Sequence, residues 1–244
     1  MRVPMNKQIL CTGLTALALA AGSAHAQIVN GSFNGLAGWN ASGDAASVGG
    51  NHLVLTNAFP DGTDDADGVI RNVSGNAPTL AGGDLEAFVG IPAGALDFDT
   101  ANDQLAYEGS AVTQTFTATA GSRLSFQWNL ATTETSTDPS LADLAFIVVD
   151  GQLITLANTL SATSATGGGD YATQTGWMDY VATFANGGTH TIAFGIVDEG
   201  QFGDTSALSV TGVGLTSAVP ESSGLAMMAA GLGLLGLARR RRKA

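Results

Sequence analysis

Apolar and polar residues alternate along the segment LSFQWNL, which spans residues 124–130. Phe126 and Trp128 fall on one face of an extended chain with the two leucines, and three polar residues fall on the other. A period of two is typical of a β-strand with one buried face. The segment therefore predicts a half-buried strand with Trp128 in the core.

The same pattern predicts further strands, separated by turns rich in Gly, Asn and Asp. They cover residues 51–57, 84–90, 111–119, 144–157 (two strands), 177–184, 190–197 and 207–215. The pair Asp150-Gly151 predicts a hairpin, because its turn needs two residues with positive φ. The segment ANGGT predicts a second hairpin between residues 177–184 and 190–197. No stretch of the body has a convincing helical period.

Many short strands with polar turns are typical of an all-β, antiparallel β-sandwich. We find no internal repeat and no Pro- or Ser-rich linker within the body. The pattern therefore predicts one domain over residues 27–216. Residues 1–26 precede it, and a tail of residues 217–244 follows.

The first 26 residues have the order of a secretory signal peptide. Arg2 and Lys7 are followed by the apolar stretch LTALALAAG, and SAHA ends in the small-x-small pattern. We expect signal peptidase to cleave between Ala26 and Gln27. The only cysteine, Cys11, would be lost, so the mature chain could form no disulfide.

The body is strongly acidic. Only Arg71 and Arg123 of the nine basic residues lie between Gln27 and Glu221, whereas all 21 acidic residues do, which gives this part a net charge of −19. Such a body cannot bind nucleic acid by neutralising phosphates, and it is suited to attracting divalent cations.

Three acidic segments could supply the oxygen ligands that Ca²⁺ prefers. The loop DGTDDADG gathers Asp61, Asp64, Asp65 and Asp67, although it lacks the turn glycine and the final glutamate of an EF-hand. A solvated acidic loop is the alternative. The second segment contains Glu134, Asp138 and Asp143, and the third contains Asp198, Glu199 and Asp204.

The sequence predicts that the protein is not an enzyme. It has no Gly-x-Ser-x-Gly, no His-Glu-x-x-His and no phosphate-binding Gly-Lys-Ser/Thr loop. His52 and His190 each head a predicted strand, where a structural role is expected. Two carboxylates suffice for glycoside hydrolysis, so a glycan-active hydrolase stays as a remote alternative.

Aromatic side chains could stack on sugar rings. Trp39 and Trp128 are expected in the core, whereas Tyr107, Tyr171 and Trp177 lie in or beside loops. These last three are the candidates for a sugar platform.

The tail has three parts. Val219, Pro220, Glu221 and Ser222 come first, then the uncharged residues 224–238, and then a basic cluster formed by Arg239, Arg240, Arg241, Arg242 and Lys243. As a helix the uncharged part would span roughly 22 Å, less than a bilayer core of about 30 Å. The basic cluster would hold the C-terminus on the cytoplasmic side. A plain tail anchor is the alternative to a processed signal.

This order resembles the PEP-CTERM sorting signal of exported proteins in Gram-negative bacteria that make exopolysaccharide. The resemblance implies recognition by an exosortase, a membrane transpeptidase that removes the tail and leaves the body at the cell surface or in the matrix. Ser222 stands where that motif has a second proline.

The body resembles jelly-roll, galactose-binding-like modules. The segment IVNGSFNGLAGWN is similar to their opening, and GDTSALSVTGVGL is similar to their closing strand. Members that bind calcium use acidic residues at these two ends. Asn34 and the segment VTGV lack those acids, so that site is not carried over.

These features favour a non-catalytic surface or matrix protein, structural or adhesive within the exopolysaccharide layer. The alternative is a carbohydrate-binding module with a defined sugar site. Extracellular polysaccharide is the partner in both hypotheses, and calcium is the one cofactor considered.

Overall fold

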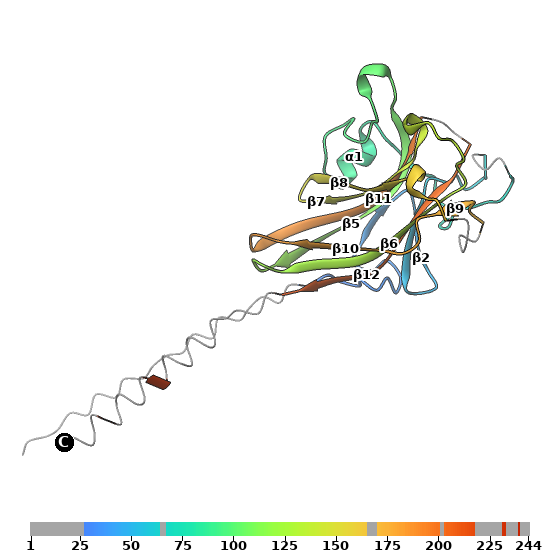
Figure 1. Cartoon of the computed structure of the whole chain (residues 1–244). Coiled ribbons are helices and arrows are strands. Elements are labelled where there is room, and N and C mark those ends of the chain that lie inside the picture. The colour runs from blue at the N-terminus through green and yellow to red at the C-terminus, as the bar shows by residue number, and fades with distance from the viewer. Residues whose placement is uncertain are drawn as a thin grey trace, which may run out of the picture.

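The computed structural model describes residues 27–63, 67–164, 170–200 and 203–217, together with residues 231, 232 and 239. Two antiparallel sheets of six strands each pack face to face (Figure 1), which confirms the predicted β-sandwich. The predicted signal peptide and most of the tail, including its motif at 219–222, lie outside the described residues. No helix in the described part of the chain is long and apolar enough to cross a membrane.

The first sheet has the strand order β1-β5-β11-β7-β8, with the short β4 also paired to β5. Its strands are β1 (Asn40–Ser42), β4 (Thr79–Leu80), β5 (Ala106–Ala118), β7 (Leu144–Val149), β8 (Gln152–Asn158) and β11 (Gly188–Glu199).

The second sheet has the order β10-β6-β12-β3-β2, with β9 paired to β6. Its strands are β2 (Asp44–Val48), β3 (His52–Thr56), β6 (Arg123–Thr132), β9 (Thr173–Gln174), β10 (Met178–Thr183) and β12 (Ser206–Thr216). The α-helix α1 (Asp84–Val89) and the 3₁₀ turns Thr100–Asn102, Pro139–Leu141 and Thr159–Ser161 complete the described elements.

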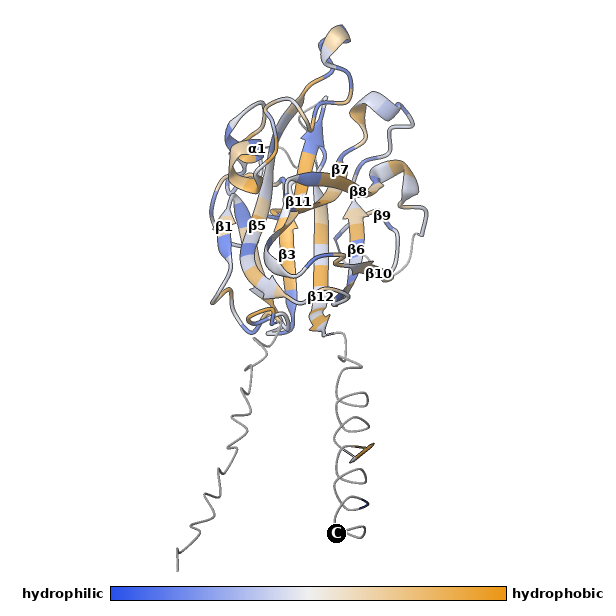
Figure 2. Ribbon diagram, turned by 90° about the vertical axis from the view of Figure 1, so that its left-hand side faces the viewer, coloured by the Kyte–Doolittle hydropathy of each residue, from blue (hydrophilic) through white to orange (hydrophobic). Residues whose placement is uncertain are grey.

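The main core lies between the sheets, as the alternation predicted. Phe126 and Trp128 on β6 are buried together with Phe194 on β11 and Trp39 from the first loop. Apolar residues alternate with polar ones along β12 (Figure 2). Both Trp39 and Trp128 are therefore core residues, as expected.

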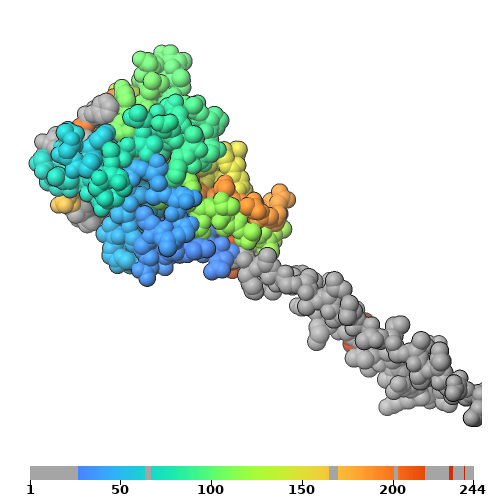
Figure 3. Space-filling model, turned by 180° about the vertical axis from the view of Figure 1, so that it is seen from behind, coloured from blue at the N-terminus to red at the C-terminus, as the bar shows by residue number. Residues whose placement is uncertain are grey.

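A second apolar cluster covers the outer face of the first sheet. Leu85 and Val89 on α1 pack with Phe146 on β7 and Val197 on β11. The Phe146 ring lies against Gly195, where an added Cβ would come within 2.2 Å of it. From behind, the residues that precede β5 form a continuous surface (Figure 3). The first sheet is therefore covered around α1 on its outer face as well as on the face that packs against the second sheet.

The strand predicted at residues 84–90 is wrong, because this segment is α1. Leu85 and Val89 stand four residues apart and share one buried helical face. The Glu86 carboxylate accepts hydrogen bonds from the backbone N–H groups of Gly82 and Gly83 at the start of the helix. Gly90 ends it with φ of 81°, a left-handed conformation that glycine adopts readily.

The predicted hairpin at Asp150-Gly151 is confirmed, and both residues have positive φ. The second predicted hairpin is wrong. β10 pairs with β6, whereas β11 pairs with β5 and β7 in the other sheet. From Ile192 onwards β11 is buried on both faces and takes a central place, whereas β10 is a half-exposed edge strand. The loop between them therefore crosses the sandwich.

Candidate functional site

A groove of about 520 Å³ lies on the outer face of the second sheet. Its floor is made by side chains that alternate with the core residues of three adjacent strands. They are Val54 on β3, Asn129 and Ala131 on β6, and Ala207 and Ser209 on β12. Because several floor side chains are small, they project little from the sheet, and the surrounding loops rise above them as walls.

One wall carries an exposed aromatic ring. Trp177 stands just before β10 and is 46% exposed, which is unusual for a tryptophan. Its ring lies 5.3 Å from the ring of His52, which begins β3. Because β6 and β12 separate β10 from β3, the Trp177 ring reaches over the groove floor. It therefore presents an apolar surface to a ligand in the groove.

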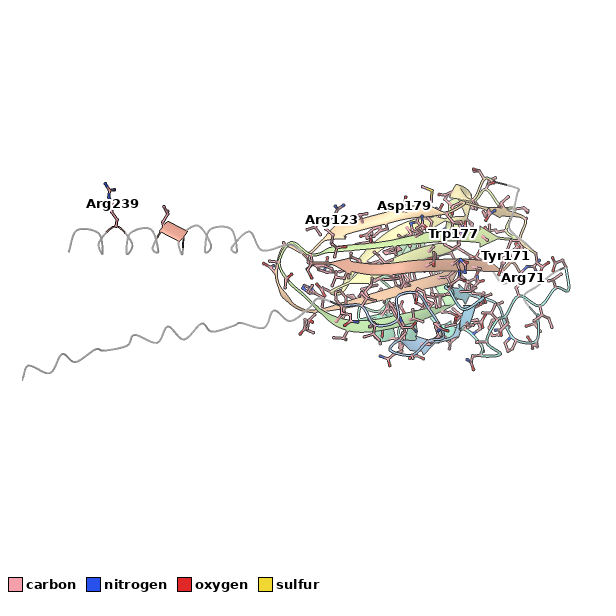
Figure 4. All side chains as sticks on the ribbon, turned by 90° about the horizontal axis from the view of Figure 1, so that it is seen from below. Arg71, Arg123, Tyr171, Trp177, Asp179 and Arg239 are labelled. Atoms are coloured by element: carbon pink, nitrogen blue, oxygen red, sulfur yellow. The ribbon has the colours of Figure 1, made fainter. Side chains whose placement is uncertain are left out.

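The other wall is formed by Arg71 and Tyr171. Their guanidinium and ring lie 5.5 Å apart, within the range of a cation–π contact. Figure 4 shows Arg71, Tyr171 and Trp177 gathered at one end of the sandwich and Arg123 towards the other. Two segments about 100 residues apart in sequence thus meet at one wall.

Arg71 is held in place by several hydrogen bonds. Its guanidinium binds the Asp67 carboxylate through two nitrogens, and it donates to the backbone carbonyls of Val69 and Asp170. The bond to Arg71 holds the pKa of Asp67 well below its usual range. The arginine in the groove wall is therefore neutralised by a carboxylate that stays ionised.

The polar groups of the floor are also ordered. Asn129 donates to the Gln174 side chain at 2.8 Å and accepts from the Thr175 hydroxyl at 3.1 Å. The same hydroxyl accepts from the backbone N–H of Leu130. Amides fixed in this way offer donors and acceptors in set positions, which is how a site selects among hydroxylated ligands.

A second hollow of about 470 Å³ adjoins the groove and shares Arg71, Asp170 and Tyr171 with it. It also contains Asp67 and Asp204, so it is more acidic. The Arg71–Tyr171 wall is thus a ridge between two hollows. An extended ligand could lie in the groove and continue over this ridge.

The structure brings together two of the three predicted platform residues. Tyr171 and Trp177 both line the groove. Tyr107 is 39% exposed on β5 in the other sheet, and the groove does not include it. The sequence did not indicate His52, Arg71, Asn129 or Gln174. Asn129 was detectable as an outward position of the alternating strand, whereas the loop residues gave no periodic signal.

Two aspartates of the predicted calcium loop lie in the described part of the chain. Asp61 accepts hydrogen bonds from the backbone and hydroxyl of Thr63, and Asp67 binds Arg71. Asp64 and Asp65 lie outside the described residues. Asp67 therefore helps to fix the groove wall by binding Arg71. Calcium binding by the loop at residues 61–67 stays a prediction.

The two histidines of the body, His52 and His190, have structural neighbours. His190 Nδ1 lies 2.7 Å from an Asp150 carboxylate oxygen, and its ring packs against Phe116 and Phe184. His52 contacts the Trp177 ring. His190 therefore ties the end of the β7–β8 hairpin to β11.

No family model matches the sequence, and no curated protein does. Among solved structures, the chain is similar to TmCBM61 in complex with β-1,4-galactotriose, at 12% identity over 80% of this chain and 99% of that one, with a TM-score of 0.33. It is also similar to the N-terminal cellulose-binding domain of Cellulomonas fimi β-1,4-glucanase C, at 14% identity over 75% and 90% of the two chains, with a TM-score of 0.30. Scores of this size assign neither a family nor a ligand to this chain.

Proposed function

We propose that the body binds a polysaccharide chain in the groove on the second sheet and acts as a non-catalytic carbohydrate-binding module. The observation that supports this most directly is the exposed Trp177 ring beside ordered amide groups on the groove floor. A flat ring stacks on the apolar face of a sugar, and amides bond its hydroxyls. The groove thus favours the alternative hypothesis from the sequence over a purely structural role.

The charges in the groove favour a neutral glycan. Arg71 is paired with Asp67, and the body as a whole carries a large negative charge. An anionic polymer would meet repulsion without a free basic partner in the groove. We therefore expect neutral hexose polymers to bind better than polymers of uronic acids.

The proposed binding is tested by replacing Trp177 with alanine. Binding is measured by affinity electrophoresis and calorimetry against neutral β-glucans, galactans and the host exopolysaccharide, with a polyuronate as the anionic comparison. We expect at least roughly tenfold weaker binding of the neutral ligand by Trp177→Ala, because the stacking surface is lost. Ligand should also shift the tryptophan fluorescence, since Trp177 is the exposed tryptophan of the described body.

Met178→Ala is the matched control. Met178 is also exposed, at 48%, and is adjacent in sequence, but it does not line the groove. Equal binding by the wild type, Met178→Ala and Trp177→Ala would contradict the proposed site. Absence of binding to every neutral glycan would contradict the proposed function itself.

We also propose that the protein is exported and sorted through its tail by an exosortase. The support is the order of the motif Val219–Ser222, the uncharged segment 224–238 and the basic cluster. The expected mature chain begins at Gln27 and ends near Glu221. Intact mass measured on membrane and extracellular fractions of the host tests this. A mass that includes Ala244, found in the membrane fraction, would contradict sorting and favour a permanent anchor.

A further inference from the structure

Five acidic side chains are buried at one end of the sandwich. Glu108 is near the start of β5, and Glu134 follows the end of β6. Asp143 directly precedes β7, and Asp198 and Glu199 end β11. Each is at most 6% exposed. Strand pairing places these termini together, since Leu144 is opposite Val197 and Ala106 is opposite Glu199. The two acidic segments that the sequence singled out around residues 134–143 and 198–204 therefore meet.

Asp143 lies at the centre of this cluster. Asn57 donates to Asp143 at 3.0 Å and lies 3.5 Å from Asp198, so it joins the two carboxyl groups. The backbone N–H of Glu199 donates to Asp143 at 3.2 Å. On the other side, the backbone N–H of Thr159 binds the carbonyl of Asp143, and the Thr159 hydroxyl binds Glu134 at 2.5 Å.

Three buried carboxyl oxygens of this cluster have no hydrogen-bond partner. In the described part of the chain they are Oε1 of Glu134, Oδ2 of Asp198 and Oε2 of Glu199. A buried polar atom without a partner costs free energy, and a buried charge costs more. Three such oxygens in one cluster therefore need protons, water or a cation to offset this cost.

Two other buried carboxylates show how this fold satisfies an anion by itself. Asp44 accepts from the backbone N–H groups of Val73 and Ser74. Glu86 accepts from three backbone N–H groups around α1. Asp44 and Glu86 are fully buried, yet their carboxyl oxygens accept hydrogen bonds from the backbone. The cluster around Asp143 differs because three of its carboxyl oxygens have no such donor.

No basic side chain compensates the cluster. The body contains only Arg71 and Arg123. Arg71 binds Asp67 in the groove wall, and Arg123 is at the opposite end of β6, paired with Thr216. Several carboxyl groups buried without a basic partner need either protons or a metal cation.

We propose that this cluster binds one Ca²⁺ ion through the carboxyl oxygens of Glu134, Asp143, Asp198 and Glu199. Ca²⁺ takes six to eight hard oxygen ligands in a flexible geometry, and four carboxyl groups supply up to eight. The donor set contains no histidine or cysteine, which disfavours zinc and copper. Mg²⁺ fits less well because it demands regular octahedral geometry.

Binding requires a local rearrangement. As the side chains stand, no three Asp, Glu, His or Cys residues among those described form a group that could hold a metal. Glu134 and Glu199 each have an unpartnered oxygen at the end of the side chain, and the proposal requires these two side chains to turn towards Asp143. The ion would cross-link the ends of β6, β7 and β11. This site is separate from the groove and from the loop at residues 61–67.

The proposal predicts calcium-dependent stability that this cluster controls. Thermal unfolding of the purified protein is followed at pH 7.5 in EDTA, in 2 mM CaCl₂ and in 2 mM MgCl₂. We expect CaCl₂ to raise the wild-type Tm by about 5–10 °C over EDTA, and MgCl₂ to raise it much less. Calorimetric titration with CaCl₂ should give a stoichiometry of one.

Asp198→Asn and Glu134→Gln keep the side-chain shape but cannot supply the carboxylate charge that a bound cation requires. We expect either variant to lose most of the calcium response while its Tm in EDTA is equal to or above that of the wild type, because a neutral amide has no charge to bury. If these side chains had a purely structural role, the variants would lower the Tm in EDTA and keep the calcium response. Asp61→Asn, in the loop at residues 61–67, is the matched control and should respond to calcium as the wild type does.

Two outcomes would overturn the proposal. One is a wild-type Tm that is the same in CaCl₂ and EDTA. The other is a calcium response that Asp198→Asn and Glu134→Gln retain, or that Asp61→Asn loses, since the ion would then bind elsewhere. Glycan binding is measured separately, so failure here leaves the proposed function standing.

Discussion

Replacing Phe194 by alanine is expected to lower the free energy of unfolding by about 3–5 kcal/mol. Phe194 is fully buried on β11 at the centre of the sandwich. Its ring lies 4.9 Å from Phe126 on β6 and 5.7 Å from Trp39, so it joins both sheets to the first loop. A truncated side chain would leave a cavity among rigid aromatic rings that cannot easily close it.

The same substitution should weaken glycan binding in the folded protein. Phe126 and Asn129 lie on opposite faces of β6, so a shift of the Phe126 ring moves the strand that carries the groove floor. Urea unfolding gives the stability change, and calorimetry in the absence of urea gives the affinity. Phe98→Ala is the control, because Phe98 is 51% exposed and should cost less than about 0.5 kcal/mol. A loss below 1 kcal/mol for Phe194→Ala would show that the core closes around the cavity.

The sequence predicted the sandwich because its strands carry a strong local signal. Alternation along β6 placed Trp128 inside, and Asp150-Gly151 specified a turn that only a few residue pairs form readily. Pairing between strands was harder to predict. No local sequence feature distinguishes a loop that turns within one sheet from a loop that crosses to the other sheet. The predicted pairing of residues 177–184 with residues 190–197 is therefore wrong, and β10 pairs with β6 instead.

The site was predictable only in part for the same physical reason. Trp177 and Tyr171 stand near loops, where an aromatic residue is a candidate for a ligand contact. Arg71 joins them through tertiary contacts across about 100 residues, which no spacing along the chain reveals. Likewise, the segments around Glu134 and Asp198 each looked acidic, but only the strand pairing shows that they form one cluster.

In EDTA, the protein is expected to lose stability as the pH rises from 5 to 8. Burial raises the pKa of Glu134 to about 7, helped by the nearby charge of Asp143. Burial and the charge of Asp143, followed by that of Asp97, raise the pKa of Glu199 to about 8. Burial also raises the pKa of Asp198 strongly, and Glu108 on β5 adds to this.

The direction follows from proton binding in the two states. An unfolded Glu has a pKa near 4.3, so between about pH 4.3 and 7 the folded protein holds a proton at Glu134 that the unfolded chain releases. Raising the pH through this window therefore removes stability, and no further loss from Glu134 occurs above it. Glu199 extends the window to about pH 8. The Glu134 window alone, about two pH units between pH 5 and 7, corresponds to roughly 2–3 kcal/mol, so we expect the Tm to fall by at least about 5–10 °C.

The cause is isolated by comparing variants and ions over the same pH range. Glu134→Gln cannot release a proton, so its Tm should fall less than that of the wild type between pH 5 and 8, and groups elsewhere contribute equally to both proteins. CaCl₂ should also flatten the wild-type profile, because a bound cation replaces the protons that the buried carboxyl groups otherwise need. A wild-type Tm that rises with pH in EDTA would mean that these carboxyl groups are ionised at low cost. The buried acids would then need neither protons nor a cation, and their unpartnered oxygens would have to be reached by water.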